Sequence, residues 1–257
     1  MPFTLCHPAI VIPLHRYARD ATSLPALAIG SMMPDFVYFF AFGVSGPFSH
    51  SVTGIFLYCV PVGALVYLLY RALLRPAFLA FLPQAVSRRM AWHIPSPWHS
   101  IRAASALLAS LAIGASTHIV WDTFTHPDTA LVSRIELLRT LVPVGGYRVP
   151  VFKILQHTSS LVGLIAIAAC TLVWYSRSTP GPPYQPSFSN RQRLLAVAGV
   201  VTATLAGGTW GLLFRSMRST EHALFNMVTS GMAAGAIGMV LVCAWWKALA
   251  LTRKREK

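Results

Sequence analysis

Five apolar runs dominate the sequence, and each is close to 20 residues long. They cover about residues 52–74, 103–124, 154–175, 194–214 and 226–248. A transmembrane helix needs about 20 consecutive apolar residues to cross the hydrocarbon core of a bilayer. Because a lipid-exposed segment must satisfy its own backbone polar groups, such runs favour α-helices over open strands. The sequence therefore predicts an all-α fold, a polytopic transmembrane helix bundle.

The composition agrees with a membrane protein and argues against a soluble domain. Of the 257 residues, 55% are hydrophobic and 11% are charged, whereas soluble domains carry about 25% charged residues. A net charge of +14 is also found in nucleic-acid-binding proteins. Here, however, the Lys and Arg residues lie between the apolar runs and in the tail rather than along one basic stripe. We therefore expect the lipid bilayer as a partner and no nucleic acid.

The first 50 residues are apolar but interrupted. Residues 1–20 predict a loop that leads into a short amphipathic helix. Residues 24–42 approach the length of a span, but Pro34 and Asp35 lie in its middle, where both are unfavourable in a bilayer. We favour a re-entrant or interfacial pair of short helices, and a sixth span is the alternative. The expected bundle has five or six spans and a short N-terminal helical segment that closes a polar site.

One integral-membrane domain is expected over residues 1–257. Its parts are the N-terminal helical segment 1–50, the site-bearing spans within 52–175, two further spans within 194–248 and a basic tail at 249–257. The distribution of basic residues predicts how these parts are oriented. On one side of the membrane we expect 13 of the 21 Lys and Arg residues. They are Arg71 and those of the loops 75–102 and 176–193 and of the tail from Lys247. By the positive-inside rule, the tail is cytoplasmic and the N-terminal segment lies outside.

The second apolar run ends in the polar motif GASTHIVWDTFTH, at Gly114–His126. His118, Asp122 and His126 recur every four residues, so they share one helix face at a spacing of about 6 Å along the axis. An ionisable residue within an apolar span is a candidate functional residue. A His and an Asp at this spacing can hold one metal ion, or they can form a hydrogen bond that joins helices. For His126, a ligand and a cap of the helix C-terminus are equally supported.

Further candidate ligands lie on the same side of the membrane in the expected topology. His50 stands at the start of the first clear span, and either neighbouring serine can cap the following helix. His7 and Asp35 lie in the N-terminal segment, where an ordinary loop or helix-start role is as well supported as a ligand. His157 lies in the first turn of the third span and is a candidate for a supporting hydrogen bond. The candidates therefore converge on one face of the membrane.

Four segments together resemble a known family. MPFTLCHPA, IGSMMPDFVYFF, FSHSVTGIF and STHIVWDTFTH are similar to the domain of unknown function 4184 family of bacterial integral-membrane proteins. The order of PD, HS and HxxxD is also similar to inner-membrane metal-dependent hydrolases and, more distantly, to the all-helical zinc phospholipase C group. This resemblance implies that the metal ligands are His7, Asp35, His50, His118 and Asp122. Those hydrolases often have a second aspartate where this chain has Val37, which counts against additional metal ions.

Two functions are consistent with these observations. In the first, the protein is a metal-dependent hydrolase at the outer face of the bacterial plasma membrane, acting on a phosphoester or lipid-linked substrate. The divalent ion would be zinc before manganese, because the donors mix imidazole and carboxylate, and Asp35 or Asp122 would act as general base. In the second, the protein is not catalytic, and the His/Asp cluster is a structural metal site or a latch between helices. The sequence does not indicate the oligomeric state.

Overall fold

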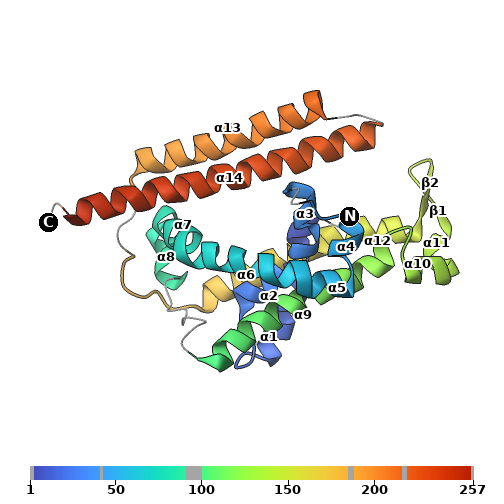
Figure 1. Cartoon of the computed structure of the whole chain (residues 1–257), viewed down its shortest axis with the longest axis horizontal. Helices are drawn as coiled ribbons and strands as arrows, with labels where there is room; N and C mark the ends of the chain where they lie inside the picture. Colours follow the sequence, from blue (N-terminus) through green and yellow to red (C-terminus); the bar gives the residue numbers. More distant parts are fainter. Residues whose placement is uncertain (1–2, 41–42, 91–99, 185–187, 216–218, 256–257) are drawn as a thin grey trace. The chain divides into compact units, whose positions relative to one another are not determined.

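The structure is a computed structural model that describes residues 3–40, 43–90, 100–184, 188–215 and 219–255. Within these residues the chain is almost entirely helical (Figure 1). Its internal contacts divide it into two compact units. Unit 1 comprises Met1–Val37, Phe42–Tyr67 and Ile94–Arg177, and unit 2 comprises Tyr38–Ala41, Leu68–His93 and Ser178–Lys257. This division by contacts is not a test of the single integral-membrane domain expected from the sequence, which stays a prediction.

Five helices in the described part of the chain are long and apolar enough to cross a membrane. They are Val52–Phe81, Ile101–Arg134, Val151–Arg177, Asn190–Phe214 and Thr220–Thr252, and the first two ranges are each built from more than one helical segment. Each contains one of the five apolar runs, so the polytopic all-α class is confirmed. The helices extend beyond the runs because polar and basic residues at their ends continue the helical hydrogen bonding. At the start of the fourth helix, for example, Ser189 and Gln192 form a capping box.

The first of these helices is built from several consecutive segments. They are α5 (Val52–Gly54), η3 (Ile55–Cys59), α6 (Val60–Leu69), η4 (Tyr70–Leu74) and α7 (Arg75–Phe81). The segments η3 and η4 are π-helical, and each adds a residue to one turn without ending the helix. A short helix, α8 (Gln84–Met90), follows. Residues 91–99 of the expected basic loop lie outside the described residues.

In unit 1, α9 (Ile101–Thr125) packs against the short helix α2 (Leu24–Gly30). Glycines bring the two backbones close together. A Cβ atom on Gly30 would lie 2.3 Å from the carbonyl oxygen of Leu111, and one on Gly114 would lie 2.3 Å from that of Leu27. Since neither position has room for a side chain, this contact requires glycine, and it brings the chain after α2 alongside α9.

The interruption expected at Pro34 and Asp35 is present. After α2, residues Met33–Asp35 form a 3-10 turn, η2, and a short helix, α3 (Phe36–Phe39), follows. The stretch Leu24–Phe39 is apolar but shorter than the five long helices. Its placement relative to a bilayer, re-entrant or spanning, stays a prediction.

The N-terminal residues form the 3-10 turn η1 (Thr4–Cys6) and α1 (Pro8–Tyr17), as expected of a loop followed by a short helix. Both elements contact α12 (Val151–Arg177). The amide of Phe3 donates a hydrogen bond to Ser160 Oγ over 3.0 Å. A Cβ atom on Gly163 would lie 2.9 Å from the Cβ of Cys6. The N-terminal turn is therefore held against α12, which positions the residues that follow it.

Residues that connect α9 to α12 form small elements that the sequence analysis did not predict. They are α10 (Ala130–Arg134), α11 (Glu136–Arg139) and a hairpin of β1 (Leu141–Val144) and β2 (Tyr147–Pro150). The strands are antiparallel, with Leu141 opposite Pro150 and Val144 opposite Tyr147. Gly145 and Gly146 have φ angles of +55° and +85°, as a tight two-residue hairpin turn requires. This Gly-Gly pair is the signal that could have predicted the hairpin.

Unit 2 contains an antiparallel pair of long helices, α13 (Asn190–Phe214) and α14 (Thr220–Arg255) (Figure 1). Small residues let the two helices approach closely. A Cβ atom on Gly207 would lie 2.3 Å from the Cβ of Ala234, and one on Gly211 would lie 2.4 Å from the carbonyl oxygen of Asn226. Packing through small residues is typical of helix pairs in membranes, where lipid and helix surfaces are equally apolar.

Candidate metal centre

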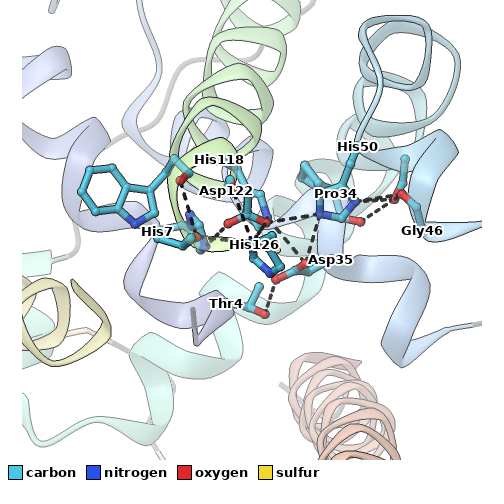
Figure 2. A network of polar contacts seen from close by, with 12 residues as sticks. Thr4, His7, Pro34, Asp35, Gly46, His50, His118, Asp122 and His126 are labelled. Atoms are coloured by element: carbon cyan, nitrogen blue, oxygen red, sulfur yellow. Dashed lines mark hydrogen bonds and ion pairs between the residues drawn. The ribbon is translucent and has the colours of Figure 1, made fainter. Parts of the chain in front are cut away.

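Four side chains of unit 1 form a compact donor group (Figure 2). Asp35 ends η2, His50 follows α4 (Gly46–Ser49), and His118 and Asp122 lie one turn apart on α9. Each offers one ligand atom, and all four atoms lie within 4.8 Å of one another. We call Asp35, His50, His118 and Asp122 the four-residue cluster.

The distances within the four-residue cluster match those around a single small ion. His50 Nε2 lies 3.4 Å from Asp35 Oδ1 and 3.6 Å from Asp122 Oδ2. His118 Nε2 lies 3.5 Å from Asp35 Oδ1 and 3.3 Å from Asp122 Oδ2. Donor atoms on a tetrahedral zinc ion, with bonds of about 2.05 Å, are about 3.3 Å apart. The residues present therefore fit one divalent ion.

Several of the buried polar atoms have no hydrogen-bond partner. Among the described residues these include Asp35 Oδ1 and His118 Nε2, and beside them His7 Nε2 and Asp122 Oδ1. An unsatisfied buried polar atom costs about 1–3 kcal/mol, so several in one place are unfavourable without a ligand. A cation between them would satisfy the two donor atoms of the four-residue cluster directly.

Backbone and hydroxyl groups orient the cluster. His118 Nδ1 lies 2.8 Å from the carbonyl oxygen of Ser31, and His50 Nδ1 lies 2.9 Å from that of Gly46. Because a carbonyl oxygen only accepts, these contacts place the ring proton on Nδ1 and leave the lone pair on Nε2 directed at the cluster. Thr4 Oγ1 donates a hydrogen bond of 2.6 Å to Asp35 Oδ2, the oxygen that faces away from the imidazoles.

His7 lies beside the four-residue cluster rather than within it. Its ring stacks on that of His118, with centroids 3.7 Å apart and planes 16° from parallel. Its Nε2 lies 3.9 Å from Asp122 Oδ1. Burial, together with the neighbouring His118, lowers the pKa of His7 to about 4. The imidazole of His7 is therefore neutral at physiological pH, and its lone pair can bind a metal ion.

His126 lies at the edge of the site. It is the C-terminal cap of α9, with an extended backbone, so the run of helical positions ends one residue before it. Its Nδ1 lies 3.7 Å from Asp122 Oδ2 and 3.3 Å from the Asp122 carbonyl oxygen. His126 is near enough to support Asp122 but is not a member of the four-residue cluster, and its ligand role stays a prediction.

The structure also locates the other residues named from the sequence. Ser51, rather than Ser49, caps the helix after His50, by accepting a hydrogen bond from the Gly54 amide. Ser49 instead donates a hydrogen bond of 2.8 Å to the Pro34 carbonyl, next to Asp35. His157 is exposed on α12 and is not part of the four-residue cluster.

Access to the site is one-sided. The side chains of Asp35 and His118 are 1% and 0% exposed, whereas those of His50 and His126 are 19% and 25% exposed. The two histidines are therefore the side chains of the site that are most open to solvent. Sequence reasoning missed the supporting groups Thr4, Ser31 and Gly46. Two of these act through carbonyl oxygens, which every residue carries, so no sequence signal could have marked them.

The comparisons with known proteins bear on the whole chain. A family model described as "Domain of unknown function (DUF4184)" matches residues 1–244. No curated protein matches the chain, and no solved structure does. The family match extends over segments of both units and includes every candidate ligand from His7 to His126. The chain belongs to the DUF4184 family.

Proposed function

We propose that this protein is a membrane-embedded, metal-dependent hydrolase whose metal is held by the four-residue cluster. The observation that carries the proposal is the set of four nitrogen–oxygen distances, 3.3–3.6 Å, between donor atoms of which Asp35 Oδ1 and His118 Nε2 are buried without a hydrogen-bond partner. Two imidazoles and two carboxylates favour zinc, and manganese is the alternative. The resemblance to metal-dependent hydrolases points to the same four residues together with His7.

Different residues of the site would have different roles in the hydrolysis. A bound divalent ion would supply a Lewis acid and lower the pKa of a bound water to about 7. Thr4 holds one oxygen of Asp35, over 2.6 Å, whereas Asp122 Oδ1 has no hydrogen-bond partner and lies 3.9 Å from His7 Nε2. This favours Asp122 over Asp35 as the general base, with the neutral imidazole of His7 beside it.

We also propose that the site faces the outside of a bacterial plasma membrane, with a cytoplasmic C-terminus. The excess of basic residues near the tail and in the loops on its side supports this orientation. A site at that face is accessible to a phosphoester or lipid-linked substrate. Reporter fusions after Lys257 test the orientation. A reporter that works only in the cytoplasm should be active there, and activity of a periplasmic reporter at that position would contradict the proposal.

A structural metal site is the second candidate function. Its support is that the four-residue cluster already supplies four protein donors, as closed structural zinc sites do, whereas most catalytic zinc sites have three and keep one position for water. In that case the ion would join three segments, which are η2, the turn that follows α4, and α9. The protein would then have no hydrolytic activity.

Elemental analysis of the detergent-purified protein tests for the metal itself. We expect about one equivalent of zinc or manganese in the wild type, and none in His118→Ala or Asp122→Ala, because each removes a donor of the cluster. His157→Ala is the matched control and should keep its metal, since His157 is exposed outside the cluster. A folded wild type that binds no metal, even after reconstitution, would leave only the helix latch.

Hydrolysis of a phosphodiester such as bis(p-nitrophenyl) phosphate distinguishes the two functions. The metal-loaded wild type should hydrolyse it, and chelation should abolish the activity. His7→Gln should keep the metal but lose activity about 100-fold, because it removes the imidazole that lies beside the general base. Full metal occupancy without hydrolysis of phosphodiester or phospholipid substrates would favour the structural site.

A further inference from the structure

Unit 2 contains an apolar cavity of about 460 Å³. Its walls come from the end of the first long helix, the beginning of α13 and the later part of α14. Side chains on these walls include Phe78, Phe81, Ala196, Val200, Met239 and Cys243. The volume lies within the range of about 300–1,000 Å³ that is usual for sites of small molecules. All of these residues belong to segments long and apolar enough to cross a membrane.

Basic side chains border this cavity. Arg75 is one of the residues that line it. Arg193 donates hydrogen bonds to the carbonyl oxygens of Phe81, over 2.8 Å, and Leu82, over 3.3 Å. Lys247 lies one helical turn after Cys243 on α14, and its Nζ donates a hydrogen bond of 3.1 Å to the Ala72 carbonyl. Three cationic groups are thus attached to the walls of one apolar cavity.

The sequence makes unit 2 strongly basic. Residues 68–93 and 178–220, which include Arg75 and Arg193, contain no Asp or Glu. Unit 2 as a whole has 13 Lys and Arg residues and 2 acidic residues. A ligand that combines a long apolar part with a negative charge would complement both the cavity and its border.

We propose that this cavity binds one acyl chain of an anionic phospholipid, with the lipid phosphate beside Arg75 and the neighbouring basic groups. In a bilayer, phospholipid surrounds the spans at high concentration, and it combines apolar chains with a phosphate that would complement the apolar wall and Arg75. Arginine pairs well with phosphate because its planar guanidinium can donate two parallel hydrogen bonds. The proposal rests on unit 2 alone and is independent of the metal centre.

Native mass spectrometry of the full-length, delipidated protein tests this site directly. Phosphatidylglycerol and phosphatidylcholine with identical acyl chains are added separately, and the fraction of protein that carries one lipid is compared. We expect about fivefold stronger binding of phosphatidylglycerol, because one basic side chain near an anionic headgroup contributes about that factor. Equal binding of the two lipids would overturn the proposal.

Two matched pairs of variants locate the bound lipid. Ala196→Phe fills the cavity and should reduce phosphatidylglycerol binding about tenfold, whereas Ala198→Phe, at an exposed position on the same helix, should not change it. Arg75→Gln should reduce the preference for phosphatidylglycerol about fivefold, and Arg215→Gln, at the opposite end of α13, should leave it unchanged.

Size-exclusion chromatography establishes that each variant is folded before lipid is added. Where Ala196→Phe is not monodisperse, Val200→Phe on the same wall of the cavity takes its place. A folded cavity-filling variant that binds phosphatidylglycerol as the wild type does would show that the lipid lies elsewhere and would overturn the proposal.

Discussion

The two units bury different kinds of side chain although both are built from apolar helices. Unit 1 has 8 basic and 5 acidic residues, and it places two carboxylates and two imidazoles together in its interior. Unit 2 has 13 basic and 2 acidic residues, and it surrounds an apolar cavity. Unit 1 therefore has a buried polar cluster that a cation would complete, and unit 2 has an apolar cavity with cations at its border.

This difference follows from the shape of the helices in each unit. In unit 2 the long helices α13 and α14 run side by side, so their contact is a continuous row of small residues. In unit 1 the short elements between Thr4 and His50 interrupt helical packing, and two of their backbone carbonyls accept hydrogen bonds from histidine rings. In membrane proteins, irregular backbone is tolerated where it lines a protein interior.

Metal binding should produce the largest difference in stability between the two units. At a free metal concentration about 1,000-fold above the dissociation constant, binding should stabilise the folded state by about 4 kcal/mol. Hydrogen exchange should show this protection in α2 and α9 of unit 1 and not in α13 and α14. Equal protection of the two units would show that metal binding stabilises both of them.

A somewhat smaller effect is expected from adding a methyl group at a glycine. Gly114→Ala should destabilise the protein by about 3 kcal/mol and lower its metal content, because the new Cβ would meet the carbonyl oxygen of Leu27 at 2.3 Å and the Ser31 amide nitrogen at 2.7 Å.

The matched substitution in unit 2 is Gly208→Ala. Its Cβ would meet nothing closer than 3.4 Å, so we expect a neutral result or a gain of up to about 1 kcal/mol from helix propensity. Thermal unfolding of both variants in detergent measures the difference. Equal melting temperatures for the two would show that α2 and α9 can move apart.

A third prediction concerns the hydrogen bond from Thr4 to Asp35. Thr4→Val keeps the shape of the side chain but removes the donor, and groups that orient a metal ligand typically contribute a factor of about 10–100 in affinity. We expect metal affinity to fall about tenfold in a competition titration with a chelator. Thr171→Val, which removes a hydroxyl bonded only within exposed α12, should have no effect, and a similar loss there would rule out a specific role for Thr4.

The smallest effect is expected at the start of α13. Ser189→Ala removes the capping box with Gln192 and should lower stability by about 1 kcal/mol. Because Ser189 belongs to unit 2, the metal content should be unchanged. Loss of metal in this variant would mean that the two units are coupled.

Part of the site could be predicted from the sequence because it depends on local spacing. Four residues make about one helical turn, so His118 and Asp122 had to lie on one face of α9, and the structure places their side chains 3.3 Å apart. His50 and Asp35 have no such relation to α9 in the sequence. They were named through the family resemblance and through the expected topology, which placed them on the same side of the membrane.

The sequence by itself determined the positions and the type of the five long helices, because the length of an apolar run sets whether it can cross a bilayer. Only the tertiary structure decided how the donors meet. Thr4 lies 31 residues from its partner Asp35, and His118 lies 87 residues from Ser31. Contacts at such separations depend on how irregular segments pack, as does the cavity between α7, α13 and α14, and helical periodicity carries no information about either.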